Sequence, residues 1–186
     1  GVKYACLFAQ VTTGIVRRVK CVHWGSNGLN LDLSECFPLR VDTYSDEGTH
    51  ILIEDCIVED QHRYLAGYAT AIMVQTTQGQ NGGDRIPWGT RNSQSALIRR
   101  NRASGTYGHG FGCGHSENVL FEDNVCLESK TGVNIDTGRN RNIVFRRNRF
   151  LMCNQGIHIG NAGGGEFAGF EIEGNYFLIT EPFYNA

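Results

Sequence analysis

The chain has 186 residues, of which 40% are apolar and 19% are charged, and its formal net charge is −2. This length fits a single domain with its own core, and the near balance of charges excludes a generally basic surface for nucleic acid. No apolar run approaches the roughly 20 residues that a membrane-spanning helix requires.

Glycine is unusually frequent, with 24 residues against 3 prolines. Because apolar residues are spread along the whole chain, this composition predicts tight turns between short strands rather than a disordered linker. The 7 cysteines show no Cys-x-x-Cys spacing, so we interpret them as small core residues and expect neither a bound metal nor another cofactor. The sequence begins at Gly1 and has no signal peptide, which predicts a processed chain or a piece of a longer one.

A repeat runs along the chain. Each copy has a short strand with alternating apolar residues, a polar turn, and a second short strand. The copies begin at Ile15, Ile51, Ala96, Val119, Ile143 and Phe170. The second strands are expected at residues 28–31, 71–74, 110–113, 132–135 and 156–159. One copy is too short to bury its own apolar face, whereas stacked copies bury it against one another.

Stacking predicts an all-β solenoid in which each strand pairs in parallel with its equivalent one coil away, with about seven coils in all. Two apolar columns should face inward: Ile53, Ile98, Phe121, Phe145 and Ile172, and Val58, Ala103, Cys126, Phe150 and Phe177. A third column consists of Cys56, Asn101, Asn124, Asn148 and Asn175. Because buried amides need hydrogen-bond partners, this third column predicts an asparagine ladder at the turn.

These features, namely Asn-φ-x-φ-x-x-Asn strands (φ is an apolar residue), turn asparagines and Gly-φ-x-φ strands, resemble the right-handed parallel β-helix superfamily of pectate-lyase-like proteins. The resemblance covers about residues 15–179. It implies a right-handed single-stranded parallel β-helix, formed by residues 1–186 as one domain of a longer chain or an oligomer. The superfamily includes lyases, glycoside hydrolases, epimerases, phage tailspikes and non-catalytic scaffolds.

In that superfamily the substrate lies along the outer face of one sheet, to which we assign the Gly-φ-x-φ strands. Alternation then directs Asn30, Met73, Gly112, Asn134 and His158 outward, and two residues later Asp32, Gln75, Gly114, Asp136 and Gly160. Asp136 and His158 are candidates for acid–base catalysis, and Asn134 is a candidate for substrate binding. The alternative is a solvated sheet face without a site.

Gly108-His109-Gly110 resembles the Gly-His-Gly segment of polygalacturonase-type glycoside hydrolases, in which the histidine lies beside the catalytic carboxylates. This resemblance makes His109 the third catalytic candidate. The Asn-Thr-Asp segment of that family is absent here. Inverting hydrolysis needs two carboxylates roughly 6.5–9.5 Å apart, and Asp136 is the one well-placed carboxylate of the outer face.

Residues 76–92 form the longest irregular stretch, which we interpret as an inserted loop, and long loops of this kind are often functional. Trp88 could stack on a sugar ring, while Arg85 and Arg91 could hold a carboxylate. Asp84 in the loop and Arg139, in a run of arginines after the outer face, complete the substrate-binding candidates. The alternatives are a loop that packs Trp88 against the coils, and arginines that lie on different faces.

Two functions compete. The first is a carbohydrate-active domain that binds and cleaves a polysaccharide, by hydrolysis or by β-elimination. The second is a non-catalytic structural or glycan-binding segment of an extracellular or virion assembly, such as a tailspike or an adhesin. The first predicts a polysaccharide partner, whereas in the second the outer face binds sugar weakly or has no ligand. For either function we expect an extracellular or virion-surface location, no nucleic acid, and a homo-oligomer such as a trimer or the remainder of a longer chain.

Overall fold

The computed structural model describes residues 6–11, 13–22, 35–36, 39–43, 50–61, 68–76, 95–114, 116–135, 140–160 and 167–179. All regular structure in these ranges is β-strand, and none of it is a helix that could cross a membrane. The strands are β1 (Cys6–Val11), β2 (Thr13–Arg17), β3 (Lys20–Val22), β4 (Glu35–Cys36), β5 (Leu39–Thr43), β6 (His50–Glu54), β7 (Ile57–Glu59), β8 (Tyr68–Thr76), β9 (Ser95–Arg99), β10 (Arg102–Gly114), β11 (Glu117–Glu122), β12 (Val125–Ile135), β13 (Asn140–Arg146), β14 (Arg149–Cys153), β15 (Gln155–Ile159), β16 (Phe167–Glu173) and β17 (Tyr176–Ile179).

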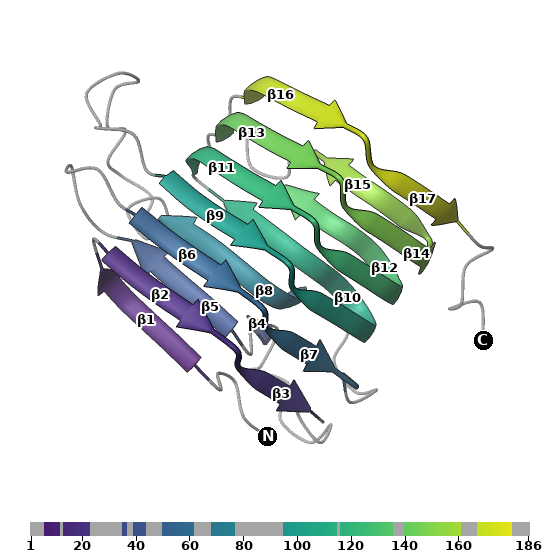
Figure 1. The fold of residues 1–186 in the computed structure, drawn as a ribbon, viewed down its shortest axis with the longest axis horizontal. Helices are drawn as coiled ribbons and strands as arrows, with labels where there is room; N and C mark the ends of the chain where they lie inside the picture. Colours follow the sequence, from purple (N-terminus) through teal and green to yellow (C-terminus); the bar gives the residue numbers. More distant parts are fainter. Residues whose placement is uncertain are drawn as a thin grey trace.

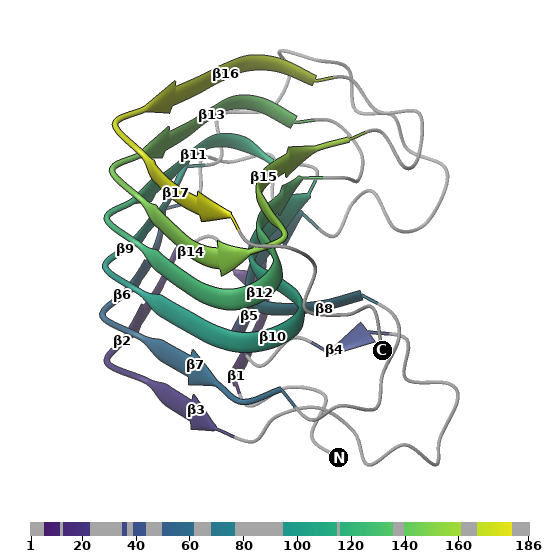
Figure 2. The same ribbon diagram turned by 90° about the vertical axis from the view of Figure 1, so that its right-hand side faces the viewer.

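The strands wind around a common axis and form two main sheets (Figures 1 and 2). The six-stranded sheet has the order β16-β13-β11-β9-β6-β2. The 11-stranded sheet has a first arm of β3, β7, β14, β17 and the N-terminal parts of β10 and β12, and a second arm of β1, β5, β8, β15 and the C-terminal parts of β10 and β12. Its eleventh strand, β4, pairs with the N-terminal end of β8. All pairings between the described strands are parallel, which confirms the predicted parallel solenoid.

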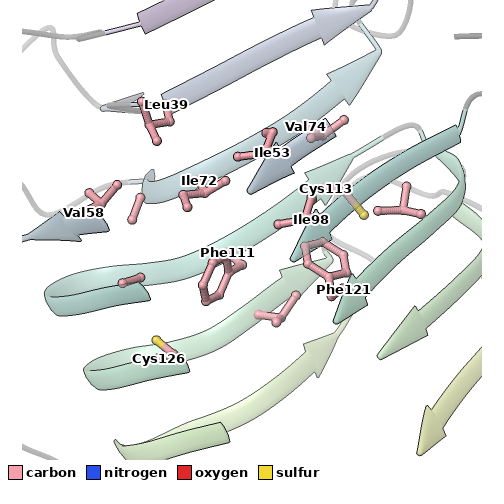
Figure 3. Packing of buried hydrophobic residues seen from close by; sticks show 14 of the residues in the cluster. Leu39, Ile53, Val58, Ile72, Val74, Ile98, Phe111, Cys113, Phe121 and Cys126 are labelled. Atoms are coloured by element: carbon pink, nitrogen blue, oxygen red, sulfur yellow. The ribbon is translucent and has the colours of Figure 1, made fainter. Parts of the chain in front are cut away.

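The core consists of columns in which each side chain stacks on its equivalent in the next coil (Figure 3). The register pairs confirm both predicted inward columns. Phe121 and Phe145 stack with ring centroids 5.5 Å apart, and both side chains are fully buried. Like residues therefore pack against one another at the coil spacing along the interior.

Asparagines at the corner between the six-stranded sheet and the first arm tie each coil to the next. The backbone N–H of Asn124 donates to Asn148 Oδ1 at 3.0 Å, and Asn124 Nδ2 donates to the backbone oxygen of Ile98 at 2.8 Å. Equivalent Nδ2 bonds are made by Asn101, Asn148 and Asn175. The predicted asparagine ladder is confirmed, and it uses both ends of each buried amide.

The outside of the same corner carries two columns of charge that alternate in sign from coil to coil. The charged column, at the ends of the strands, is Arg17, Glu54, Arg99, Glu122, Arg146 and Glu173. The turn column, with positive φ, is Arg18, Asp55, Arg100, Asp123 and Arg147. Arg100 bridges Glu54 and Asp55 at 2.7 and 2.8 Å, and Arg147 bridges Glu122 and Asp123 at 2.8 and 2.9 Å. Alternation thus gives each of these arginines carboxylate neighbours.

Two expectations for the first coils were wrong. Ile15 is not equivalent to Ile51, because Gly14 pairs with Ile51 and Ile15 pairs with Leu52. A slip of one residue moves a strand side chain to the other face, so Ile15 points outward and is 59% exposed, while Val16 enters the core. The second wrong expectation is that residues 28–31 form the strand next to residues 71–74. That neighbouring strand is β5, which begins at Leu39 and pairs with β8. Residues 28–31, and the inserted loop beyond Thr76, lie outside the described residues.

Replacing Asn148 with alanine should lower the free energy of unfolding by about 3 kcal/mol, because the backbone N–H of Asn124 and the backbone oxygen of Phe121, both in the preceding coil, lose these hydrogen bonds. Urea unfolding followed by circular dichroism measures this loss. Asn175→Ala is the matched control, since Asn175 makes the equivalent amide bond in the last described coil but is only partly buried. The loss should be clearly smaller there, and equal losses would contradict the importance of burial.

Stability should fall in acid, because arginines lower the pKa of several corner carboxyls. The pKa of Glu54 lies below its ordinary 4.5, mainly through a hydrogen bond from Arg99, and the Arg100 and Arg147 guanidiniums lower the pKa of Asp55 and Asp123 in the same way. A lowered folded-state pKa adds stability that is present above the unfolded value and is lost as the pH falls through the folded value.

The urea midpoint of wild type should therefore decrease as the pH is lowered below about 4.5, the ordinary value for Glu54. Glu54→Gln should be less stable than wild type at pH 7, and the difference should vanish at the acid end of the titration. Glu117→Gln, outside the charged columns, serves as the control. A Glu54→Gln difference that persists unchanged into acid would contradict the electrostatic account.

Candidate active site on the second arm

The outer face of the second arm aligns one residue from each coil. Register pairs place Arg40, Met73, Gly112, Asn134 and His158 in one column. The predicted positions of the last four are confirmed. In the first of these coils the strand begins at Leu39, so Arg40 and Asp42 take the register positions that were predicted for Asn30 and Asp32. Asn30 and Asp32 themselves lie outside the described residues.

The alternate residues of these strands face the core, as predicted. Ile72, Val74, Phe111, Cys113, Val133 and Ile135 are at most 1% exposed. In the last of these coils Ile157 packs against the core cluster and Ile159 is 37% exposed. The inward and outward faces of the second arm are therefore separated by the ordinary alternation of a strand.

Asn134 and His158 form a hydrogen-bonded pair across two adjacent coils. His158 Nδ1 lies 2.7 Å from Asn134 Oδ1. An amide oxygen only accepts, so with this amide orientation Nδ1 carries the proton and Nε2 is the acceptor of a neutral imidazole. Asn134 is only 6% exposed, whereas His158 is partly exposed. The pair thus offers the imidazole to the outside and uses the buried amide to orient it.

The glycine after this strand also fixes the imidazole. A Cβ atom at Gly160 would lie 2.7 Å from His158 Cε1 and 3.0 Å from Nε2, so the ring covers this residue. The backbone N–H of Gly160 donates to the backbone oxygen of Ile135 at 2.9 Å, which holds the glycine in place. His158 is therefore positioned from one side by Asn134 and from another by the backbone.

Beyond the pair, the outward column continues with a covered glycine and a methionine. Met73 is only 8% exposed although it faces outward, and its sulfur would be 3.0 Å from a Cβ atom at Gly112. Thr70 Cγ2 is 3.2 Å from the same position. The outer face is therefore not a uniformly solvated polar surface: it combines one polar pair with a methionine that fills the space above a glycine. The alternation of apolar and polar residues in the sequence does not predict that Met73 covers Gly112.

His109 lies on the same arm but is not part of the pair. It is in β10, in register with Thr70 and Thr131, and Thr131 in turn pairs with Gln155. His158 is two coils and three residues away, which corresponds to about 14 Å along the sheet. The structure thus brings Asn134 and His158 together, whereas His109 lies nearer the N-terminal end of the strand segments that form the second arm.

The glycines around His109 have a packing explanation. A Cβ atom at Gly108 would lie 2.1 Å from the backbone oxygen of Ala69 in the preceding coil, and one at Gly110 would lie 2.3 Å from Cys126 Sγ in the core. Since real Cβ contacts essentially never fall below 3.0 Å, coil stacking alone requires both glycines. The Gly-His-Gly pattern therefore follows from packing, and it gives no independent support for a catalytic His109.

A family model for the right-handed β-helix region matches residues 30–178. The chain belongs to the right-handed β-helix family. This finding confirms the predicted fold class and its handedness. No curated protein and no solved structure gave a significant match, so the pectate-lyase-like and polygalacturonase-like resemblances stay predictions for this β-helix.

Six of the predicted site residues lie outside the described parts of this β-helix. They are Asp84, Arg85, Trp88, Arg91, Asp136 and Arg139. Of the neighbouring arginine run, Arg146 and Arg147 form ion pairs with Glu173 and Asp123 at the corner, so these two arginines do not contribute to a basic surface beside the second arm.

Two polar residues that the sequence did not single out, Thr131 and Gln155, lie next to the predicted ones. Thr131 Oγ1 donates to Gln155 Oε1 at 3.3 Å, which continues the polar column at His109 into the next coil.

In the described ranges no group of three or more His, Cys, Asp and Glu side chains could hold a metal ion. In the part of the chain that the structure describes, the two outward register columns of the second arm contain one acidic residue, Asp42, and one histidine, His158.

Gly108→Ala should destabilise the β-helix by about 3 kcal/mol or more, because its methyl group would collide with backbone rather than with a mobile side chain. His109→Ala should change the free energy of unfolding by less than about 1 kcal/mol, since His109 is partly exposed. Urea unfolding of both variants checks this. A tolerated alanine at residue 108 would contradict the packing explanation.

Proposed function

We propose that this β-helix domain binds a polysaccharide along the outer face of its second arm, with His158 and Asn134 as the contact point. The observation that carries the proposal is the 2.7 Å hydrogen bond between His158 Nδ1 and Asn134 Oδ1. It leaves His158 Nε2 as a positioned acceptor for a sugar hydroxyl, while the protonated ring would donate to a uronate carboxylate.

The surroundings of the pair support carbohydrate as the ligand. The outward column beyond Asn134 continues with Gly112 in the adjacent coil and Met73 in the coil after it, and Met73 covers Gly112 with an apolar side chain. Sugar binding commonly combines hydrogen bonds from a few fixed polar groups with contact between the apolar face of the ring and a flat surface. The parallel coils repeat at about 4.8 Å, so a chain molecule can lie along the column.

A more specific proposal is that the domain also cleaves the polysaccharide. Hydrolysis would require Asp136 together with a second carboxylate, for which Asp84 is the candidate. A β-elimination requires one base and a group that neutralises the uronate carboxylate, so His158 or His109 could serve as the base and Arg85, Arg91 or Arg139 as the neutralising group. Trp88 would contribute stacking. Since β-elimination needs fewer carboxylates than hydrolysis, we favour β-elimination as the cleavage reaction.

A specific observation favours the second candidate, a glycan-binding structural segment of an extracellular or virion assembly. The last described coil exposes residues of the core columns: Ile172 is 55% exposed and Phe177 is 43% exposed, whereas Phe145 and Phe150 in the preceding coil are fully buried. Stacked repeats need their terminal faces covered. A longer chain or a neighbouring subunit that covers this coil would place the domain in a larger assembly.

Binding should be measured on a panel of neutral and acidic polysaccharides by calorimetry. His158→Ala and Asn134→Ala should each weaken binding of the recognised polysaccharide about tenfold or more, because each removes one member of the pair. His50→Ala, an exposed histidine on the six-stranded sheet, is the matched control and should bind as wild type does. Folded protein that binds nothing in the panel, or wild-type affinity in both variants, would overturn the proposal.

The same samples report on cleavage. New reducing ends without unsaturated uronate would indicate hydrolysis, and both signals together would indicate β-elimination. Binding without either signal would assign the domain to the non-catalytic class, with the glycan site retained.

A further inference from the structure

An unbroken apolar column runs along the outer face of the six-stranded sheet. The register pairs align Ile15, Leu52, Leu97, Leu120 and Val144, and the last coil continues the column with Glu171. These residues alternate with the buried core residues of the same strands, so they point away from the core. Ile15 is 59% exposed and the other four apolar residues are partly exposed. We call these five residues the apolar stripe.

The apolar stripe is bordered by two polar columns. On one side lies the charged column, from Arg17 to Glu173, whose sign alternates from coil to coil. On the other side lie uncharged polar residues such as Thr13, Asn118 and Asn142. Figure 1 looks onto this sheet, and no described strand lies in front of it. An apolar column with a polar border on an open sheet face is typical of a protein interface.

We propose that this face binds a second copy of the same chain, in a dimer whose two β-helix axes run antiparallel. The two-fold axis would lie parallel to the strands at the centre of the six-stranded sheet. Each coil then faces the coil at the opposite end of the stack in the partner copy. Leu97 of one copy faces Leu120 of the other, and Leu52 faces Val144, so apolar residues meet at the centre.

The alternating charges select this arrangement. In chain order the charged column reads plus, minus, plus, minus, plus, minus over six coils. Reversing such a column with an even number of members places each charge opposite one of the other sign. Arg17 then faces Glu173, Glu54 faces Arg146, and Arg99 faces Glu122. The charge pattern is therefore complementary to its own antiparallel copy.

The other face-to-face two-fold, with parallel helix axes, lacks this match. It places each coil opposite its own equivalent and turns the charged column onto the uncharged polar column of the partner. Glu171 of the two copies would then meet directly, which is repulsive. In the antiparallel arrangement Glu171 instead lies opposite Ile15 and beside Arg17 of the partner.

The size of the face sets the strength of the dimer. Six strands about 4.8 Å apart and five residues long make a face of about 400 Å² per copy. Standard interfaces bury about 800 Å² per partner, so this dimer belongs to the weak class and should form in a concentration-dependent manner. Because the charges of the column other than that of Glu54 are at least partly exposed, high salt should weaken the dimer.

Sedimentation equilibrium of the 186-residue chain over a wide concentration range, without glycan, tests the proposal. Wild type should pass from monomer to dimer as the concentration rises. Leu120→Asp should raise the dissociation constant about tenfold or more, while Leu151→Asp, an equally partly exposed leucine on the first arm, should leave it unchanged. Wild type that stays monomeric throughout would overturn the proposal and leave the stripe to a different partner, as would a Leu120→Asp variant that is folded and still dimeric.

Thiol crosslinking with a short bifunctional maleimide tests the orientation. In a background with Cys6 and Cys36 replaced by serine, a mixture of Leu52→Cys and Val144→Cys chains should form a crosslinked heterodimer, because these residues face each other across sheets about 10 Å apart. Leu52→Cys alone should not crosslink, because its two copies are offset by three coils, about 14 Å along the stack. Crosslinking of Leu52→Cys with itself, without the heterodimer, would overturn the antiparallel arrangement. Both tests are independent of the polysaccharide, so their failure and the failure of the proposed function are distinguishable.

Discussion

The hydrogen bonds of the corner asparagines fix the register between coils, and the rest of the molecule depends on that register. Each amide oxygen accepts from the preceding coil's backbone, as Asn148 Oδ1 does from Asn124, and each amide nitrogen donates to a backbone oxygen such as that of Phe121. A slip of one residue would break these bonds and would also turn every core residue outward. Register is therefore specified twice, by polar groups at the corner and by apolar columns in the interior.

Fixed register is also what creates the candidate site. Asn134 and His158 are far apart in the sequence, and they become a hydrogen-bonded pair because their strands occupy equivalent positions in adjacent coils. The glycines near His109 have the same origin, since neighbouring coils approach too closely at Gly108 and Gly110 to leave space for a side chain. In this fold, a residue pattern that resembles a catalytic motif can thus be a requirement of stacking.

Register gives the charged residues of the corner their order as well. Along the chain, Glu122 and Asp123 form an acidic pair and Arg146 and Arg147 form a basic pair, with no sign of a network. Stacking places these pairs side by side, so that each guanidinium reaches carboxylates of the neighbouring coil. Individual exposed ion pairs contribute little to stability, but a continuous alternating column neutralises a dense row of charge and gives one face of the molecule a defined polarity pattern.

The sequence by itself determined the fold class, the inward columns and the asparagine ladder, because periodic stacking demands equivalent residues at equivalent positions, as Phe121 and Phe145 show. It also identified Asn134 and His158 as outward neighbours. It did not determine the first coils, where Ile15 was misplaced by one residue, since one copy alone carries too few anchors to set its register. Only the tertiary structure decided that Asn134 is buried and bonded to His158, that Met73 covers Gly112, and that charges alternate across coils, because these contacts join residues whose proximity depends on the completed stack.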